Sequence, residues 1–363
     1  MYRITASTLA AVLILAGVAH AVVQTIDATV SVRVEQTIPP DTVNTDTAFE
    51  SLGETTGNLP LVAEARLLES GFPDSGSAAS TRLADPRLSE TPDPAEFGLA
   101  ALANSLNGPS SWSASGIATE TREVAFLADE IGASDGTGLR ARSYFFLDGV
   151  MVLWHQGGGD DLTGAGAEVV VQVQQTRGDA DPVVVLTAGM SLTGQPGGFA
   201  ALQAGGALVP ENVILLDISE LVPQLGTVQL AILPKLAIPY EYDALVAESF
   251  TLKATADARI SSPSEAGAAV VLGPSVEDIA GLLSDVAGAD LGGILAEVLD
   301  IHLKSGLTAA RPLTTDNPAT RVTVTRQSRL LPGWPLCGVM GAEAALGLTV
   351  FLGLVTFPRR SGR

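Results

Sequence analysis

Cysteine is almost absent from this sequence. Cys337 is the single cysteine of the 363 residues, and it lies inside a hydrophobic run near the C-terminus. Everything before that run therefore carries no thiol and can form no internal disulfide. The chain must fold by burying an ordinary apolar core, and it is long enough to do so.

Basic residues are also scarce. Twenty Lys and Arg stand against forty Asp and Glu, which gives a formal net charge of −20, and lysine occurs only at Lys235, Lys253 and Lys304. Proteins that bind nucleic acids need clustered Lys and Arg side chains against the phosphates. The composition therefore excludes DNA and RNA as expected partners.

Histidine is the third scarcity. Only three histidines occur, and His20 lies within the N-terminal segment that we interpret below as a signal. A histidine-based metal site or serine triad would have to use His155 or His302, and no HExxH or GxSxG motif accompanies either. We therefore expect no catalytic and no cofactor-binding residue, which favours a non-enzymatic protein. A triad that includes His155 stays open, because triads assemble in space.

The first residues have the pattern of a secretory signal. Arg3 precedes an apolar stretch over residues 9–18, and an Ala-His-Ala tripeptide ending at Ala21 then fits a small-x-small cleavage site. The apolar stretch is shorter than the about 20 residues that span a bilayer. We predict a signal peptide over residues 1–21 with cleavage after Ala21. An uncleaved anchor is the alternative.

A second hydrophobic segment covers residues 334–357. It is apolar except for Glu343 and long enough to cross a bilayer, and the basic tail 358–363 follows, with Arg359, Arg360 and Arg363. Arginines directly after an apolar run are typical of a cytoplasmic stop. We expect a C-terminal transmembrane helix, with the membrane as a partner and the body outside. A processed tail and a buried core helix are the alternatives.

The layout of signal, exported body, Pro/Gly junction, hydrophobic stretch and terminal arginines resembles the C-terminal sorting signals of bacterial and archaeal surface proteins, including the PEP-CTERM type. The resemblance covers about the last 35 residues. The junction at residues 331–335 reads Leu-Pro-Gly-Trp-Pro, which differs from the Pro-Glu-Pro of that class and from the Leu-Pro-x-Thr-Gly of sortase substrates. The resemblance implies a protein exported to the cell surface or envelope.

The body between these ends divides by composition. Residues 22–36 alternate apolar and polar side chains, which predicts a half-buried strand. Residues 37–115 are rich in Pro, Ser, Thr, Gly and Asp, and we expect a low-complexity, loosely structured segment with short helices near 61–68 and 97–106. Residues 116–329 carry many short strand patterns separated by Gly or Pro turns. They predict a domain of their own.

For that domain we expect an antiparallel β-sandwich of jelly-roll-like type. Asp148-Gly149 between two apolar runs predicts a tight type I′ hairpin over residues 142–155. Two apolar stripes at helical spacing predict a helical hairpin near residues 276–304. Further strands are expected at residues 168–174, 183–192, 213–218, 227–233, 250–260, 269–272 and 321–326.

Two acidic loops are candidate metal sites. Asp160 and Asp161 lie in a glycine-rich stretch, and Asp179 and Asp181 lie in a second turn. Carboxylates are hard oxygen ligands suited to calcium, although neither loop has the spacing of an EF-hand. Calcium is thus the one candidate cofactor, and a solvated turn without a ligand is the alternative.

Carbohydrate chemistry supplies a second set of candidates. Glycoside hydrolysis needs a pair of carboxylates, and sugars stack on aromatic rings. Carboxylates on or near expected strands are Glu168, Asp217 and Glu241. The candidate aromatics are Trp112, Trp154, Tyr240 and Tyr242, although Trp154 is better used in the core.

The sequence therefore favours an exported, C-terminally membrane-anchored surface or envelope protein. Its β-sandwich ectodomain would act in structure, adhesion or binding of an unknown protein or glycan. One alternative is a secreted carbohydrate-active enzyme or carbohydrate-binding module. Another is a subunit of an envelope complex, for which an unpaired edge strand or exposed apolar patch is expected.

Overall fold

A computed structural model describes residues 21–52, 60–84, 94, 97–105, 108–155, 159–220, 226–263, 265–273 and 321–324. These residues belong to one compact unit, Met1–Thr325. They are mainly β, as predicted. The strands are β1 (Ala21–Ile38), β2 (Thr42–Ser51), β3 (Leu61–Glu69), β4 (Phe72–Leu83), β5 (Phe97–Ser105), β6 (Ser111–Phe126), β7 (Gly138–His155), β8 (Gly166–Thr176), β9 (Val183–Gly194), β10 (Ala200–Gly206), β11 (Ile214–Asp217), β12 (Thr227–Leu245), β13 (Ser249–Ser262), β14 (Ala266–Leu272) and β15 (Arg321–Val324). Two short helices accompany them, α1 (Ala128–Ile131) and η2 (Pro210–Asn212).

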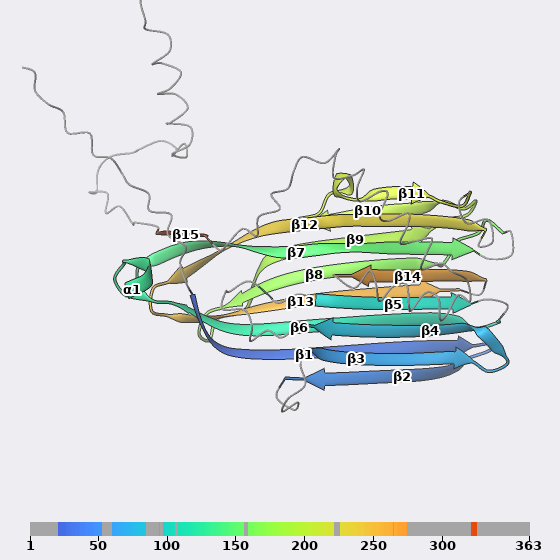
Figure 1. Cartoon of the computed structure of the whole chain (residues 1–363), viewed down its shortest axis with the longest axis horizontal. Helices are drawn as coiled ribbons and strands as arrows, with labels where there is room; N and C mark the ends of the chain where they lie inside the picture. The colour runs from blue at the N-terminus through green and yellow to red at the C-terminus, as the bar shows by residue number, and fades with distance from the viewer. Residues whose placement is uncertain are drawn as a thin grey trace, which may run out of the picture. The chain divides into compact units, whose positions relative to one another are not determined.

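The strands form two antiparallel sheets that lie one over the other (Figure 1). Sheet A has the order β11-β12-β7-β14-β5-β4-β3. In addition, the short strand β15 pairs with the start of β7. Sheet B has the order β10-β9-β8-β13-β6-β1-β2. The sandwich thus has one lateral edge made by β2 and β3 and another made by β10 and β11.

The core lies between the two sheets and follows from alternation along the strands. In β13, and in β6 as far as Val124, every second side chain is buried and the side chains between them are partly or fully exposed. Sheet-to-sheet contact is close, since a Cβ added to Gly116 of β6 would lie 2.4 Å from Oγ1 of Thr81 on β4. β14 is buried on both faces. Side chains of a strand alternate between the two faces of its sheet, so a sheet that packs on another needs apolar residues at every second position.

The expectation of a loosely structured segment over residues 37–115 is wrong for the described residues. They form β2, β3, β4, β5 and the start of β6. The two segments expected as short helices are strands β3 and β5. Leu and Ala favour helices only weakly, and burial between sheets overrides that preference. The many Ser, Thr and Gly residues of this region are small side chains within strands.

The tight hairpin at Asp148-Gly149 is also wrong. β7 runs without a turn from Gly138 to His155 and pairs with β12 over this length, with a register shift between Leu233 and Leu236 opposite the Asp-Gly pair. Gly149 meets a different need from that of a turn. A Cβ there would lie 2.3 Å from the carbonyl oxygen of Val271 on β14, so only glycine allows this close approach.

Several predicted segments lie outside the described residues: 1–20 of the signal, the helical hairpin near 276–304, the transmembrane or sorting helix 334–357, and the tail 358–363. Within the described ranges, no helix is long and apolar enough to span a membrane. The strand predicted over 22–36 lies within β1.

Candidate functional site

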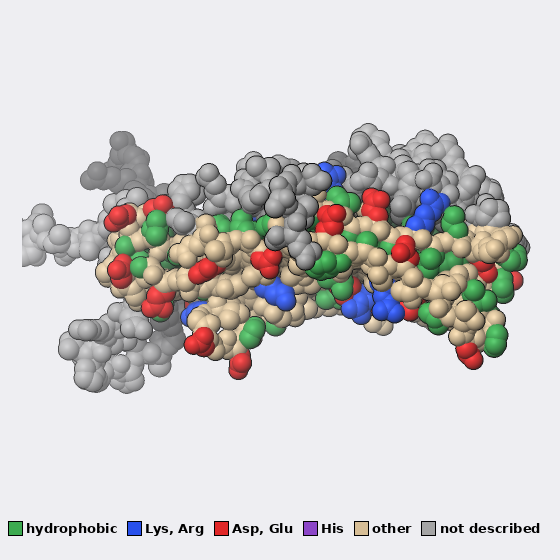
Figure 2. Space-filling view, turned by 90° about the horizontal axis from the view of Figure 1, so that it is seen from below, with side chains coloured by type: hydrophobic (Ala, Val, Ile, Leu, Met, Phe, Trp, Pro, Cys, Tyr) green, Lys and Arg blue, Asp and Glu red, His purple; other side chains and the backbone are tan. Residues whose placement is uncertain are grey.

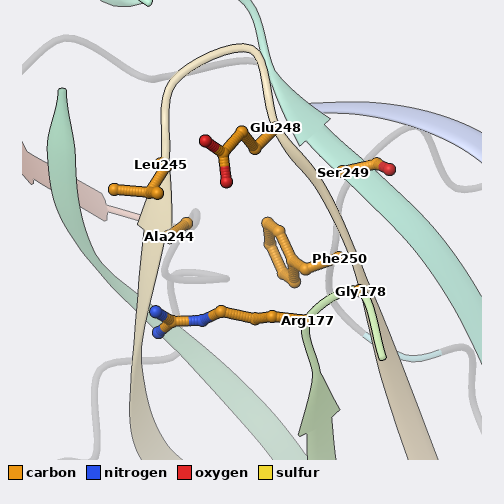
Figure 3. Close-up of a pocket in the computed structure, with 7 residues that line it drawn as sticks. All are labelled: Arg177, Gly178, Ala244, Leu245, Glu248, Ser249 and Phe250. Atoms are coloured by element: carbon orange, nitrogen blue, oxygen red, sulfur yellow. The ribbon is translucent and has the colours of Figure 1, made fainter. Parts of the chain in front are cut away.

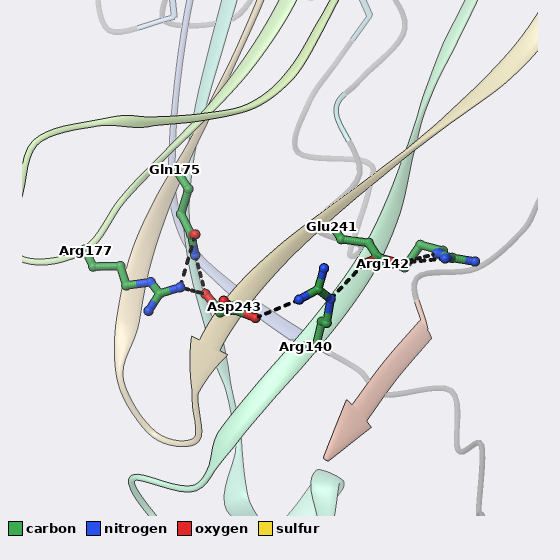
Figure 4. A network of polar contacts seen from close by, with 6 residues as sticks. All are labelled: Arg140, Arg142, Gln175, Arg177, Glu241 and Asp243. Atoms are coloured by element: carbon green, nitrogen blue, oxygen red, sulfur yellow. Dashed lines mark hydrogen bonds and ion pairs between the residues drawn. The ribbon is translucent and has the colours of Figure 1, made fainter. Parts of the chain in front are cut away.

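An arginine network lies at one end of the sandwich, where β7 begins and β12 ends (Figure 4). The antiparallel register places Arg142 opposite Glu241 and Arg140 opposite Asp243. Nε of Arg140 donates to Oε2 of Glu241 at 2.7 Å, and Nε of Arg142 donates to Oε1 at 2.9 Å. Glu241 is therefore held between two guanidinium groups.

This pairing sets the charge of the network. Hydrogen bonds from Arg140 and then Arg142 lower the pKa of Glu241 below its ordinary value. The same contacts raise the pKa of both arginines. A carboxylate bound in this way is a poor proton donor near neutral pH, because its charged form is the one that is stabilised. Glu241 is a structural anion and does not fit a general acid.

A second part of the network joins the two sheets. Gln175 and Arg177 come from the end of β8 in sheet B, and Asp243 belongs to β12 in sheet A. Nε2 of Gln175 donates to the Asp243 carbonyl oxygen at 2.7 Å, and the Arg177 guanidinium donates to the same oxygen. The side chain of Asp243 lies 3.9 Å from Nη1 of Arg140. The network thus ties the sheets together at this end.

A hollow of about 390 Å³ opens beside this tie. It is lined by Arg177, Gly178, Ala244, Leu245, Glu248, Ser249 and Phe250. Figure 3 shows Arg177 and Glu248 on opposite sides with the Phe250 ring between them. Phe250 stacks on Phe126 at a centroid distance of 5.9 Å and contacts Tyr242 at 5.5 Å, so the apolar floor is fixed by the core. A cationic wall, an anionic wall and an apolar floor are features of small-ligand sites.

The structure does not bring the candidate calcium ligands together. Asp160 and Asp161 precede β8 and Asp179 and Asp181 follow it, so the pairs are separated by a strand of 11 residues, about 35 Å. Asp161 accepts a hydrogen bond from the Thr163 backbone N–H at 2.9 Å, and hydrogen bonds from Thr163 lower its pKa. Among the described residues, no group of three or more His, Cys, Asp or Glu is placed to hold a metal.

The candidate carboxylates for glycoside hydrolysis are also apart. Glu168 lies on sheet B, whereas Asp217 and Glu241 belong to sheet A. Asp217 faces Gln229, twelve positions before Glu241 on β12, which is roughly 40 Å. Catalytic pairs lie within about 10 Å. These three residues cannot act together on one glycosidic bond.

The predicted sugar-stacking platform is wrong as well. All four aromatic side chains are at most 3% exposed and belong to the core. A ring buried between sheets presents no face to a ligand. The buried residues are Trp112, Trp154, Tyr240 and Tyr242.

His155 ends β7 at the opposite end of the sandwich. Its ring lies over Gly159, where an added Cβ would be 2.2 Å from the ring carbon Cε1. Its Nδ1 is buried and has no hydrogen-bond partner among the described residues. No serine hydroxyl in that part of the chain engages this nitrogen, so the triad hypothesis gains no support. His302 lies outside the described residues.

Two buried polar clusters were missed by the sequence analysis. In β6, Glu120 and Arg122 form an ion pair whose side chains are 1% and 2% exposed. At the end opposite the hollow, Glu69 accepts a hydrogen bond from Ser110 at 2.6 Å, and the Ser110 hydroxyl accepts one from Gln36 at 3.0 Å. Glu120 and Arg122 share the parity of the buried alternate residues of β6, which is the signal that would have found them.

Comparison with known proteins gives no family. No protein-family model and no curated protein matches the chain. One solved structure, described as "Structure of infectious bursal disease virus Gx strain", aligns with 71% of this chain and 63% of its own, at 9% identity and a TM-score of 0.08. The chain thus spans less than two thirds of that protein's length. Such a TM-score does not indicate a shared fold.

Proposed function

We propose that this protein is a non-enzymatic surface or envelope protein whose β-sandwich body is exported and anchored by the C-terminal hydrophobic segment. One observation carries the proposal. Ala21, the predicted cleavage position, begins β1 and pairs with Phe126, while β15 pairs with the start of β7 at residues 139–142. The strands that adjoin the signal and the hydrophobic segment therefore reach the same end of the sandwich (Figure 1). The hollow lies at this end too, because its lining includes the end of β12 and the start of β13.

This arrangement suits a body attached at one end. β12 has 19 residues and β7 has 18, which corresponds to a sandwich about 60 Å long. Attachment through the residues after β15 would place the far end, with His155 and Asp161, away from the bilayer. The role is then to hold those distal loops at a distance, in a structural, adhesive or binding function.

The jelly-roll-like refinement belongs to the same proposal. The chain crosses between the sheets from β5 to β6, from β6 to β7, and from β12 through β13 to β14, which supports it. The meanders β3-β4-β5 and β8-β9-β10 each stay within one sheet. The chain also crosses between the sheets at the lateral edges, from β2 to β3 and from β10 to β11, so we propose a jelly-roll-like sandwich that contains these two meanders.

Attachment is tested by fractionating cells that express the full chain and, in parallel, a chain ending at Arg329. We expect the full chain to stay with membranes through alkaline extraction and the shortened chain to be released. Release of both chains, or retention of both, would contradict anchoring by residues 334–357.

Orientation is tested separately in the full chain carrying Cys337→Ser. A fluorophore is placed on Asp161→Cys or on Glu248→Cys, which are exposed positions at opposite ends of the sandwich. We expect stronger energy transfer from position 248 to an acceptor dye in the lipid. Equal transfer, or stronger transfer from position 161, would contradict attachment at the end with the hollow, even if the chain is anchored in the membrane.

A further inference from the structure

The two lateral edges of the sandwich differ in charge. β2 carries Asp46 and Glu50, β3 carries charged residues along its length, and β11 ends in Asp217. β10 has no charged residue and no proline. The whole stretch between Asp181 and Glu211, which contains β9 and β10, is free of charged residues in a chain of net charge −20.

The edge formed by β3 is closed by side chains of the other sheet. Oε2 of Glu50 accepts a hydrogen bond from the Val62 backbone N–H at 3.1 Å, and Oδ2 of Asp46 accepts one from the Arg66 N–H at 2.9 Å. Figure 2 looks onto this edge and shows acidic and basic side chains along it. Carboxylates that occupy outward N–H groups leave them unavailable to another strand, and charges along an edge oppose pairing.

The edge formed by β10 has no such protection among the described residues. The Phe199 carbonyl accepts from the Gln195 N–H, and the Ala207 N–H donates to the Thr187 carbonyl, so the odd-numbered residues of this strand face β9. The backbone groups of the even-numbered residues therefore point outward. They belong to Ala200, Leu202, Ala204 and Gly206. Within the described ranges β10 pairs with β9 alone.

We propose that β10 pairs with β10 of a second copy of this chain, antiparallel and centred on Gln203, so that sheet B continues through the dimer. The absence of charge makes this edge compatible with its own copy. Each chain carries a net charge of −20, and among the strands at the two lateral edges, β2, β3, β10 and β11, only β10 can pair with itself without bringing like charges into register. The pairing depends on this edge and not on the membrane anchor, so it stands apart from the proposed function.

The register follows from symmetry. Centring on Gln203 pairs all seven residues, with Leu202 opposite Ala204 of the second copy and Ala200 opposite its Gly206. The outward groups then form roughly eight hydrogen bonds, two for each such pair. Gln203 is exposed and meets its own copy as a non-hydrogen-bonded pair, whose Cα atoms lie about 4.5 Å apart. That separation fits a disulfide.

Oxidative cross-linking of the purified full chain tests this register. In the Cys337→Ser background we expect Gln203→Cys to give a cross-linked dimer and Ala201→Cys to give about tenfold less, because two residues at position 201 would be roughly 14 Å apart. Two differently tagged copies, mixed before oxidation, show whether both partners are this chain.

A backbone variant completes the test. The N–H of Ala204 points away from β9, so adding Ala204→Pro to the Gln203→Cys chain removes no bond within the sandwich but blocks the new edge. We expect the dimer to be lost while the thermal midpoint of unfolding stays near that of the parent. The proposal is overturned if Gln203→Cys stays monomeric, if both cysteine variants cross-link equally, or if the cross-linked partner is another protein.

Discussion

At the scale of single residues, the buried ion pair of β6 has the largest energetic consequence. Glu120 and Arg122 lie between the sheets, where each charge has lost its water and depends on protein partners. Arg122→Met leaves the Glu120 carboxylate without its arginine in a low-dielectric interior. We expect the free energy of unfolding to fall by about 3–5 kcal/mol, measured by chemical denaturation.

The double variant Glu120→Leu/Arg122→Met is the matched control. Replacing a buried pair by apolar groups of similar volume is often neutral or stabilising. The double variant should therefore recover most of the loss. A single variant within about 1 kcal/mol of the parent would show that the pair is already neutralised by other groups.

Glu241 makes a different prediction, because its contribution depends on pH. Hydrogen bonds from Arg140 and Arg142 lower its folded-state pKa below the unfolded value of about 4.3. The stabilisation is therefore fully present above that unfolded value and is lost as pH falls through the folded pKa. We expect Glu241→Gln to make the fall in thermal midpoint between about pH 5 and pH 2 shallower.

Glu64→Gln provides the comparison for this pH series. Glu64 is exposed on β3 and forms no ion pair with any arginine of the described residues. The Glu64→Gln variant removes one carboxylate without removing an arginine contact. Its thermal midpoint should therefore fall with decreasing pH as that of the parent does. Identical profiles for the Glu241 and Glu64 variants would contradict the role of the arginines.

The role of a residue could be predicted from the sequence only where the residues that contact it are its neighbours along the chain. Asp161 was singled out because it stands in a visible glycine-rich loop, and it forms a local turn with Thr163. Glu120 was not, because its burial depends on sheet A covering that face of β6. Trp154 lies in the core, the use that its sequence context favoured over a ligand platform.

At the scale of elements, strands with regular alternation were predictable and their partners were not. β8, β9 and β13 lie where apolar and polar residues alternate. The pattern failed in β3 and β5, where Leu and Ala runs resemble helices until both neighbours are known. It also failed at Asp148-Gly149. Gly149 is required because β14 approaches it closely, and the sequence alone does not distinguish such a glycine from one in a turn.

The closed edge of β3 gives a prediction at this scale. Asp46→Ala/Glu50→Ala removes the acceptors that occupy the N–H groups of Arg66 and Val62. An edge with unoccupied donors is a template for another strand. We expect concentration-dependent self-association of the full chain, measured by light scattering.

Asp46→Asn/Glu50→Gln separates the acceptor from the charge. It removes the same two charges but keeps an amide oxygen at each position, so it should associate less than the alanine variant. Equal association of both variants would show that charge alone protects the edge. No association of either would show that the carboxylates do not guard it.

At the scale of the whole molecule, the sequence predicted two antiparallel sheets but not how they are held together at their ends. One end is tied by the Glu69, Ser110 and Gln36 cluster. The other is tied by Gln175 and Arg177 of β8, which donate to the Asp243 carbonyl of β12. These ties join residues that are between 41 and 74 positions apart, which no local pattern reveals. The proposed attachment uses the second of these ends.

The tie at the hollow predicts where the sandwich opens first. Gln175→Ala/Arg177→Ala leaves the Asp243 carbonyl without its side-chain donors from sheet B, while the core beneath β5 and β14 is untouched. The free energy of local opening depends on the stability of the region that opens and can be much smaller than the free energy of global unfolding. We expect hydrogen exchange, followed by mass spectrometry, to speed up in residues 126–138, 177–182 and 244–250 and to stay slow in β5 and β14.

Arg259→Ala is the control for that experiment, because Arg259 pairs with Asp257 two positions away on the same strand. Losing that pair removes a charged contact without untying the sheets, and exposed pairs contribute little to stability. Exchange at the hollow should therefore match the parent. If Arg259→Ala speeds exchange there as much as the double variant does, loss of an arginine and not loss of the inter-sheet tie controls opening. If the double variant speeds exchange in β5 and β14 equally, the two sheets open as one cooperative unit and the end has no separate stability.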